Sequence, residues 1–368
     1  MTTTASSADN RFTRLLATRA WLLADGATGS NLFDAGLMSG DAPELWNIDQ
    51  PAKITALHQG FVDAGADILL TNTFGGTRYR LKLHHSEGRV AELNLAAARL
   101  ARAVADASGR EVAVAGSMGP TGEIMEPIGP LSIAQATEAF AEQARSLKEG
   151  GADVLWIETM SSVEEVQAAV AGAATTGLPI VCTLSFDTNG RTMMGISPSD
   201  FASLEKTLVP RLAACGTNCG VGASEVVACI HNLAAAAGPD VVLVAKGNCG
   251  IPQYVDGSIV YNGTPELMAV YARMALDAGA RIIGGCCGTS PRHLRAMRDA
   301  LDAHTPSASP QLEEIVSALG DVSTGARAQW GGEQSRLGGA APGANLARGR
   351  GRRSGGGGGA SSTTSTAE

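Results

Sequence analysis

Two adjacent cysteines near the end of the chain, Cys286 and Cys287, are the residues with the clearest capacity for chemistry. They follow a short apolar run and stand between glycines, which let the backbone come close to a ligand. Neighbouring cysteines form a disulfide with each other only under strain, but both thiols can bind one soft metal ion. The simpler alternative is a pair of small buried residues, because free cysteine is often just buried. The rest of the chain has to decide between these two interpretations.

The composition describes a large globular protein with no preference for anionic partners. The chain has 368 residues, of which 44% are apolar, and its formal net charge is −8. This acidic balance gives no electrostatic reason to bind nucleic acid or an anionic membrane. We find no pattern of a signal peptide or of a membrane-spanning run. The odd number of cysteines, seven, then favours a reducing, cytoplasmic location, where thiols serve as ligands or core residues rather than in disulfides.

One short phrase occurs three times and marks the passage from a helix into a strand. It consists of a glycine, a small residue and the start of an apolar run, and it begins at Gly65, Gly151 and Gly279. Glycine in this place suits the left-handed conformation that ends many helices. The repetition of this joint predicts a repeated βα architecture.

Eight apolar segments alternate with eight amphipathic ones. We expect strands at residues 21–24, 68–74, 112–116, 154–159, 180–186, 212–218, 241–246 and 281–285. We expect helices at residues 51–64, 88–107, 132–149, 163–174, 198–208, 224–236, 265–278 and 291–303. Near-continuous apolar strands between helices are typical of a parallel sheet covered on both faces. The pattern predicts an α/β fold, a (β/α)8 TIM barrel over residues 12–304. An open doubly wound sheet is less favoured, because no Gly-x-Gly-x-x-Gly turn follows the first strand.

The composition changes after about residue 305, where Pro, Ser, Gly and Ala dominate. Such a segment cannot bury enough apolar surface to offset the entropy of the chain. We therefore expect residues 305–368 to form a disordered Gly/Ser/Arg-rich tail. Its small basic cluster at residues 348–353 is better explained as part of a solvated tail than as a nucleic-acid site.

Acids and cysteines recur at the predicted strand ends, where barrels place their chemistry. The strand-end residues of this kind are Asp25, Glu158, Cys219, Cys249, Cys286 and Cys287. Three or four thiolates at one point form a soft-metal site, for which zinc is the usual ion. Only closure of the barrel could bring them together, because no Cys-x2-Cys pair occurs. The histidines fall on helices or loops, and Cys182, Cys215 and Cys229 are expected in the core.

The strand-end motifs resemble those of the homocysteine S-methyltransferase family from about residue 21 to residue 303. The matching blocks, in order, are Asp25-Gly26-Ala27-Thr28-Gly29, Thr71-Asn72-Thr73-Phe74, Ile157-Glu158-Thr159, Asn218-Cys219 and Gly284-Gly285-Cys286-Cys287-Gly288-Thr289. The resemblance implies a zinc-containing (β/α)8 barrel that methylates homocysteine to methionine. The family includes betaine-dependent and S-methylmethionine-dependent enzymes and the homocysteine-binding module of cobalamin-dependent methionine synthase.

The resemblance implies that the cofactor Zn²⁺ is bound by Cys219, Cys286 and Cys287, with Cys249 outside the ligand set. Methyl transfer to sulfur needs a thiolate, and a free thiol with a pKa of about 8.5 is only slightly ionised at neutral pH. Zinc with three protein ligands keeps a fourth position open, where a substrate thiol loses its proton. The residue types therefore fit the implied chemistry.

The resemblance also implies how the amino acid part of homocysteine is bound. Its amino group would meet Asp25 and Glu158, and its carboxylate would meet backbone amides near Gly26 and Thr73. Taken alone, either acid could instead be a helix cap or half of a strand-end salt bridge.

Betaine is the methyl donor that we favour, by analogy with bacterial chains that resemble this one. A quaternary ammonium group binds well to aromatic faces. The positions at which animal-type betaine enzymes carry aromatics are here Gly75, Gly76, Thr77 and Met160. The aromatics that could form a different cage are Trp46, Phe74, Phe186 and Tyr254.

Four alternatives remain open at this point. The chain could be the homocysteine-activating subunit of a split cobalamin-dependent methionine synthase, which needs a separate protein that carries cobalamin. It could instead use S-methylmethionine as the donor. Two further alternatives are a barrel lyase or isomerase whose cysteines are only core residues, and a regulatory protein with a closed, structural zinc site that includes Cys249.

Overall fold

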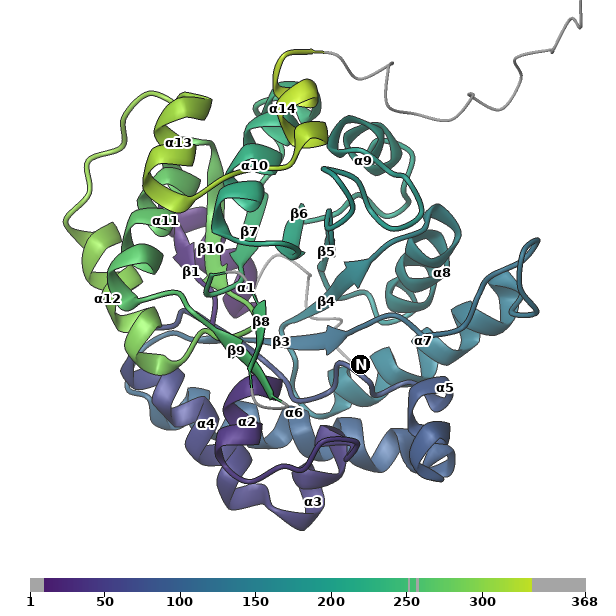
Figure 1. The fold of residues 1–368 in the computed structure, drawn as a ribbon. Helices are drawn as coiled ribbons and strands as arrows, with labels where there is room; N and C mark the ends of the chain where they lie inside the picture. The colour runs from purple at the N-terminus through teal and green to yellow at the C-terminus, as the bar shows by residue number, and fades with distance from the viewer. Residues whose placement is uncertain (1–9, 251, 256–257, 333–368) are drawn as a thin grey trace, which may run out of the picture.

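The computed structural model of the chain describes residues 10–250, 252–255 and 258–332. Eight parallel strands form one sheet in the order β1-β10-β7-β6-β5-β4-β3-β2. A parallel bridge between Ala24 and Ile68 joins the two ends of this order, so the sheet curves round into a barrel (Figure 1). The strands are β1 (Leu22–Leu23), β2 (Ile68–Leu70), β3 (Ala113–Met118), β4 (Val154–Met160), β5 (Ile180–Leu184), β6 (Ala214–Cys219), β7 (Leu243–Gly247) and β10 (Ala280–Gly285).

Helices form an outer ring around the strands (Figure 1). They are α4 (Pro51–Asp63), α6 (Val90–Ala107), α7 (Ile133–Glu149), α8 (Val163–Ala174), α9 (Pro198–Glu205), α10 (Ala223–Ala237), α11 (Pro265–Asp277) and α12 (Pro291–Asp302). Local sequence explains where several begin: α7 starts with a capping box between Ser132 and Gln135, and α12 carries proline in its first turn. The predicted (β/α)8 barrel is confirmed, and each predicted strand and helix has a counterpart.

Shorter elements decorate the barrel. Between β1 and α4 lie α2 (Gly29–Asp34), η2 (Pro43–Leu45) and α3 (Trp46–Asp49). Between β2 and α6 lie α5 (Arg78–Leu81), η3 (Lys82–His84) and η4 (Glu87–Arg89). An antiparallel hairpin of β8 (Pro252–Val255) and β9 (Ser258–Tyr261) follows β7. Because each of these segments follows a strand, they stand at the carboxyl edge of the barrel, where they can enclose a site.

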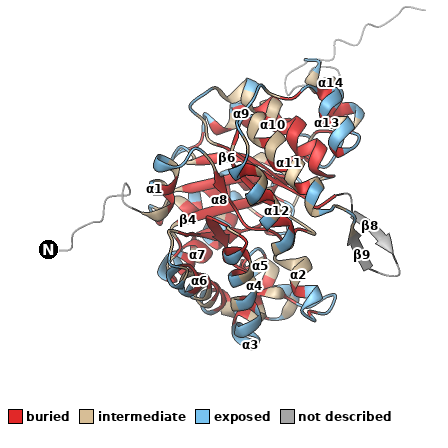
Figure 2. Cartoon of the chain, turned by 90° about the vertical axis from the view of Figure 1, so that its left-hand side faces the viewer, coloured by how far each residue is buried: buried red, intermediate tan, exposed pale blue. Residues whose placement is uncertain are grey.

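The strands are apolar on both faces because each face packs against a different partner. In β4, Val154 and Trp156 belong to a cluster that fills the inside of the barrel, whereas Leu155 and Ile157 pack against the helices. This arrangement explains the near-continuous apolar runs in the sequence. Phe12 of α1 (Arg11–Thr18) belongs to the inner cluster too, so α1 covers the amino-terminal end of the barrel. Figure 2 shows the buried strands enclosed by helices whose outer faces are exposed.

The predicted disordered tail does not begin at residue 305. Two helices, α13 (Leu312–Leu319) and α14 (Thr324–Trp330), pack against α10. Leu312, Ile315 and Leu319 lie on one face of α13, and the Trp330 ring stacks on His231 with 3.7 Å between centroids. The prediction was wrong here because composition averaged over the whole segment hid one short amphipathic stretch. Residues 333–368, which include the arginine cluster, lie outside the described residues.

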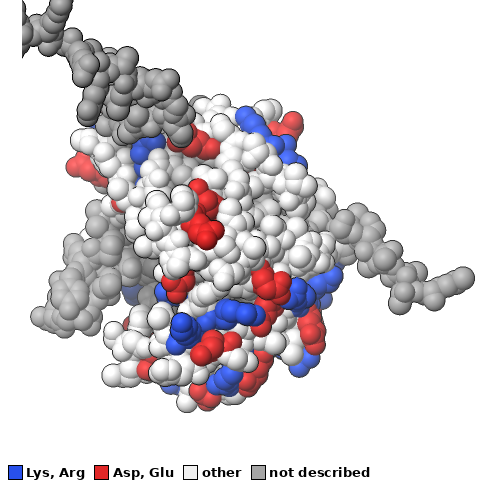
Figure 3. Space-filling model, turned by 90° about the vertical axis from the view of Figure 1, so that its right-hand side faces the viewer, with Lys and Arg blue, Asp and Glu red and all other residues white. Residues whose placement is uncertain are grey.

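The described part of the chain contains no helix that is long and apolar enough to cross a membrane. On the face shown in Figure 3, Lys and Arg side chains are interspersed with Asp and Glu. Among the described residues, Arg78 pairs with Glu142 and Arg145 pairs with Glu138.

Candidate active site

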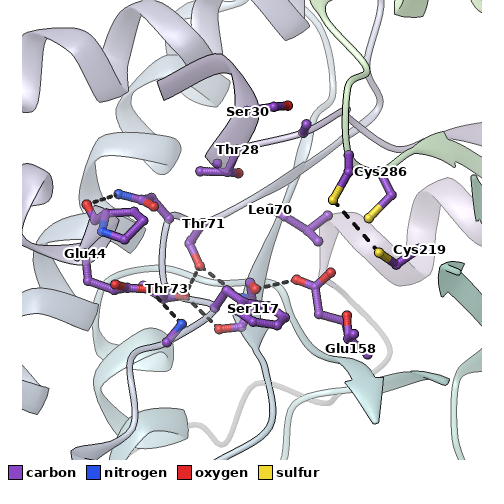
Figure 4. A pocket seen from close by; sticks show the side chains of 18 of the residues that line it. Thr28, Ser30, Glu44, Leu70, Thr71, Thr73, Ser117, Glu158, Cys219 and Cys286 are labelled. Atoms are coloured by element: carbon purple, nitrogen blue, oxygen red, sulfur yellow. Dashed lines mark hydrogen bonds between the residues drawn. The ribbon is translucent and has the colours of Figure 1, made fainter. Parts of the chain in front are cut away.

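A cavity of about 340 Å³ opens at the carboxyl edge of the barrel. The segments that line it come from the ends of β1, β2, β3, β4, β6, β7 and β10, although these lie far apart in the sequence. Figure 4 shows its side chains converging from several strands. The lining residues whose side chains can take part in chemistry are Asp41, Glu44, Thr73, Arg80, His84, Ser117, Glu158, Cys219, Lys246, Cys286 and Cys287. Gly26, which follows Asp25, also lines the cavity.

Three thiols from two strand ends meet in this cavity. The sulfur atoms of Cys219, Cys286 and Cys287 all lie within 4.8 Å of one another, and those of Cys219 and Cys287 are 3.9 Å apart. Zinc–sulfur bonds of about 2.3 Å in tetrahedral geometry place two sulfur ligands about 3.8 Å apart. The three thiols therefore fit one zinc ion.

The backbone at these strand ends is held in an unusual conformation. Cys219 and Thr159 both have a φ of +63°, in the left-handed region that residues other than glycine seldom adopt. Asn218, which directly precedes Cys219, bonds to Thr159 through both ends of its amide. Its Oδ1 accepts from Thr159 N at 2.8 Å, and its Nδ2 donates to Thr159 Oγ1 at 2.7 Å. Such backbone strain persists where surrounding contacts enforce it and is common at functional sites.

Asn248, at the end of β7, ties the two cysteine segments together. Its Nδ2 donates to the carbonyl of Gly220 at 2.7 Å, and its Oδ1 accepts from the amide of Cys287 at 3.1 Å. One side chain thus bonds to the residue after Cys219 and to Cys287 itself. The amide fixes how far apart the two segments lie, as outer residues of metal sites commonly do.

The three thiols hold their protons in the absence of a metal. A hydrogen bond with Cys286, together with burial, raises the pKa of Cys219 to about 12. A hydrogen bond with Cys219, together with burial, raises the pKa of Cys287 to about 11. The contact with Cys219 lowers the pKa of Cys286, but the contact with Cys287 and burial raise it overall. A metal ion that binds here at neutral pH must therefore displace protons.

Two buried carboxylates and one buried ammonium group lie beside the thiols. Asp25 and Lys246 form an ion pair of 2.8 Å, and both side chains are 2% exposed. Glu158 accepts a hydrogen bond from the hydroxyl of Ser117 (Figure 4). Burial raises the pKa of Glu158, against the opposing effects of Lys246 and Ser117. Burial lowers the pKa of Lys246, but the charges of Asp25 and Glu158 raise it overall, so Lys246 stays a cation.

The other two predicted substrate-binding residues, Gly26 and Thr73, also line the cavity. A side chain at Gly26 has no room, because a Cβ there would stand 2.5 Å from the carbonyl oxygen of Thr289. The amide of Thr73 donates to the carbonyl of Thr71 at 2.9 Å, and its hydroxyl donates to the carbonyl of Ser117 at 2.7 Å. Thr73 therefore shapes the wall, and its own amide is already engaged.

The remaining cysteines stand apart from the three thiols. Cys249 is 1% exposed, and its thiol donates to the carbonyl of Gly263 at 3.3 Å. Cys182, Cys215 and Cys229 are buried in the core, as predicted. Among the described residues, the group that could hold a metal is formed by Cys219, Cys286 and Cys287 alone.

Of the four aromatic residues proposed for a donor cage, Phe74 lines the cavity, and its side chain is 38% exposed. Trp46 packs in a separate apolar cluster, where Lys53 lies 4.4 Å from its ring centroid. Phe186 is buried in the core. The side chain of Tyr254 lies outside the described residues. The described part of the cavity therefore does not contain a multi-ring aromatic cage.

Sequence reasoning assigned no role in the site to Lys246, Ser117, Asn218 or Asn248, although Asn218 belongs to one of the matching blocks. Each stands within two residues of a predicted strand end, which is a signal that was available. A lysine inside an otherwise apolar strand, Val241–Lys246 in the sequence, was the strongest such signal, since lysine is seldom fully buried without a partner. What the sequence could not tell was that this partner is Asp25, 221 residues away.

The fold defines a protein of the (β/α)8-barrel class, and its cavity lies at the carboxyl edge, where barrel enzymes place their chemistry. The model of the homocysteine S-methyltransferase family matches residues 22–301. The chain therefore belongs to the homocysteine S-methyltransferase family.

Similar proteins include the methionine synthases of two mycobacteria. That of Mycobacterium tuberculosis is 29% identical over 316 residues, which cover 81% of this chain and 26% of the relative. That of Mycobacterium leprae is 29% identical over 343 residues, which cover 88% of this chain and 28% of the relative. The chain thus spans about a quarter of the length of these relatives.

A solved structure with the same fold is that of the homocysteine methyltransferase MmuM from Escherichia coli in its metallated form. It matches with a TM-score of 0.65 and 24% identity, and the match covers 79% of this chain and 99% of that chain. At this level of identity the likeness concerns the fold.

Proposed function

We propose that the protein catalyses the zinc-dependent transfer of a methyl group to the thiol of homocysteine, which gives methionine. The observation that carries the proposal is the convergence of three thiols on a cavity that also holds buried carboxylates. Family membership supports methyl transfer to homocysteine. The ligands that would hold Zn²⁺ are Cys219, Cys286 and Cys287.

Different groups around the cavity would bind the thiol, the ammonium group and the carboxylate of homocysteine. When bound, zinc would supply a Lewis acid that favours the thiolate form of the substrate. Glu158 would accept the ammonium group of homocysteine, with Asp25 close by. Backbone amides near Gly26 and Thr73 would receive its carboxylate, although the amide of Thr73 itself already donates to Thr71. The substrate would thus be fixed at both ends, which orients its sulfur toward the donor.

We favour betaine as the donor, because the outer part of the cavity carries complementary groups. Phe74 offers an aromatic face to a trimethylammonium group. Arg80 and His84 line the same cavity and would attract a carboxylate. Glu44 is also buried there, and it accepts a hydrogen bond from the amide of Gly75 at 2.6 Å.

The test is methionine formation by the zinc-loaded protein with betaine, S-methylmethionine and methylcobalamin offered separately. Turnover with betaine, reduced at least about tenfold in Phe74→Ala, is the expected result. Turnover with S-methylmethionine alone would show that S-methylmethionine, not betaine, is the donor, while the proposed methyl transfer to homocysteine would stand. Failure with all three donors, despite bound zinc, would overturn the donor assignment.

A second candidate is the homocysteine-activating subunit of a split methionine synthase that works with a cobalamin-carrying protein. It is favoured by the methionine synthase relatives and by the loops at the carboxyl edge, which expose large apolar side chains. These side chains are Met38, Ile124, Ile128, Met193 and Met194. Exposed apolar surface near a site commonly marks a protein interface. Turnover with methylcobalamin but with neither small donor would establish this alternative.

A further inference from the structure

Lys246 occupies a position in β7 where the sequence pattern calls for an apolar residue. The side chain is 2% exposed, and its Nζ lies 2.8 Å from Asp25 Oδ1. The ring of Trp156 lies below it, with 5.6 Å from Nζ to the ring centroid. Lys246 also lines the cavity. A buried lysine is costly unless it is paired, so this one must offset its burial through the carboxylates that face it.

Asp25 and Glu158 differ in how much of their hydrogen-bonding capacity the protein already uses. Both oxygens of Asp25 have a partner: Oδ1 receives Lys246, and Oδ2 receives the amide of Leu70 at 2.7 Å. Glu158 receives the hydroxyl of Ser117 on Oε1, and no described residue donates to Oε2. The oxygen open to a ligand therefore belongs to Glu158.

The charges in this corner of the cavity leave room for one more cation. The charged or titratable groups that face Lys246 are Asp25 after β1, Glu158 on β4 and the thiol of Cys286 after β10. The two carboxylates and the one ammonium group sum to −1. Without the ammonium, the charge of Asp25 would raise the pKa of the buried Glu158 unopposed by a cation, and its carboxylate would take up a proton more readily. The substrate ammonium would then have to compete with that proton.

We propose that Lys246 is a positioning residue that makes the cavity selective for a thiol with an α-ammonium group, because it pairs with Asp25 and thereby leaves Glu158 free to bind that group. The inference rests on the proposed function, since it concerns how homocysteine is recognised. It changes the role of Asp25, which serves mainly to hold Lys246 in place.

The experiment compares Lys246→Met, which has a similar length and no charge, with Lys246→Arg, which keeps the charge. Lys206→Met is the control on the surface. Binding to the zinc-loaded protein is measured by calorimetry between about pH 6.5 and pH 9, with homocysteine and with 4-mercaptobutanoate, which lacks the amino group. KM and kcat for methionine formation are measured in parallel.

The Lys246→Met variant should bind homocysteine at least about tenfold more weakly near neutral pH, and the loss should shrink as the pH rises and Glu158 loses its proton. Its affinity for 4-mercaptobutanoate and its zinc content should change by less than about twofold. KM should rise more than kcat falls, and Lys246→Arg should restore most of the affinity.

Equal losses for both thiols, or a loss that does not vary with pH, would overturn the inference and make Lys246 a structural or carboxylate-binding residue. The two proposals fail in different ways. A wild-type protein that binds homocysteine in this pattern but makes no methionine contradicts the proposed function and leaves the role of Lys246 standing. A wild-type protein that does not bind homocysteine overturns both.

Discussion

Two buried aspartates at opposite ends of the barrel show how one chemical pattern serves two purposes. Asp67, at the amino-terminal edge, is 1% exposed and faces three arginines, with Arg298 nearest at 3.1 Å, Arg110 at 3.4 Å and Arg19 at 3.7 Å. It also accepts the amide of Leu23 at 3.0 Å. Asp25, at the carboxyl edge, faces one lysine beside a cavity.

The difference lies in what each cluster leaves unsatisfied. The charge on Asp67 is surrounded by cations from the residue after α1, from α12 and from the segment before β3, which ties distant parts of the chain together. The cluster around Asp25 contains one carboxylate more than it has cations, and the unused oxygen faces the cavity. We infer that the first cluster stabilises the fold, whereas the second is kept incomplete for a ligand.

The comparison assigns function to the carboxyl edge and stability to the amino-terminal edge. The largest loss of activity is therefore expected when one of the three thiols at the carboxyl edge is removed. Cys286→Ser should lose bound zinc and lower methionine formation at least about 1,000-fold, or about 4 kcal/mol of activation free energy. Elemental analysis and a rate assay measure the two quantities. Cys182→Ala, in the core, should keep the zinc. A Cys286→Ser protein with one zinc per chain and full activity contradicts the assignment.

Asp67→Asn should instead act on stability. Removing the carboxylate leaves three arginines without their shared partner, so the free energy of unfolding should fall by about 3–5 kcal/mol. Denaturant titration measures this change. The folded fraction should keep its wild-type KM for homocysteine. A raised KM with unchanged stability would erase the distinction between the two edges.

Glu158→Gln should weaken homocysteine binding with little effect on stability. Losing a charge-assisted bond to the substrate ammonium should lower kcat/KM by about 1.5–3 kcal/mol. Steady-state kinetics and a thermal melt distinguish the two effects. An unchanged kcat/KM would show that the substrate ammonium is bound elsewhere.

Glu158 also determines how kcat/KM should change with pH. Because burial raises the pKa of Glu158, the carboxylate takes up its proton at a higher pH than an exposed glutamate, and kcat/KM should fall as the pH falls through that value. The folded chain holds this proton more tightly than the unfolded chain, so the associated stability is present at low pH and is lost as the pH rises. In Glu158→Gln, this acidic limb of the pH profile should be absent.

The smallest effect is expected far from both edges, in the helices that follow the barrel. Trp330→Ala removes the stack on His231 and should cost about 1–2 kcal/mol of unfolding free energy, with kcat and KM unchanged. Phe33→Ala, a change of an exposed aromatic, is the matched control. A large loss of activity in Trp330→Ala would show that these helices act on the site.

Much of the fold could be predicted from the sequence because its signals are local. A helix cap at Ser132 and the apolar run of β4 depend on neighbours within a few residues. The tail from residue 305 was mispredicted for the opposite reason. The apolar face of α13 is stable only because α10 offers a surface to cover, and that surface lies about 80 residues earlier in the chain.

By itself, the sequence determined the alternation of strands and helices and the identity of the residues at the strand ends, including the cysteines. These features follow from side-chain type and spacing along the chain. The tertiary structure decided which strand ends face one cavity, that Cys249 stands apart from the three thiols, and that Lys246 pairs with Asp25. Those outcomes depend on how the barrel closes, because closure sets the distances between groups that are remote in the sequence.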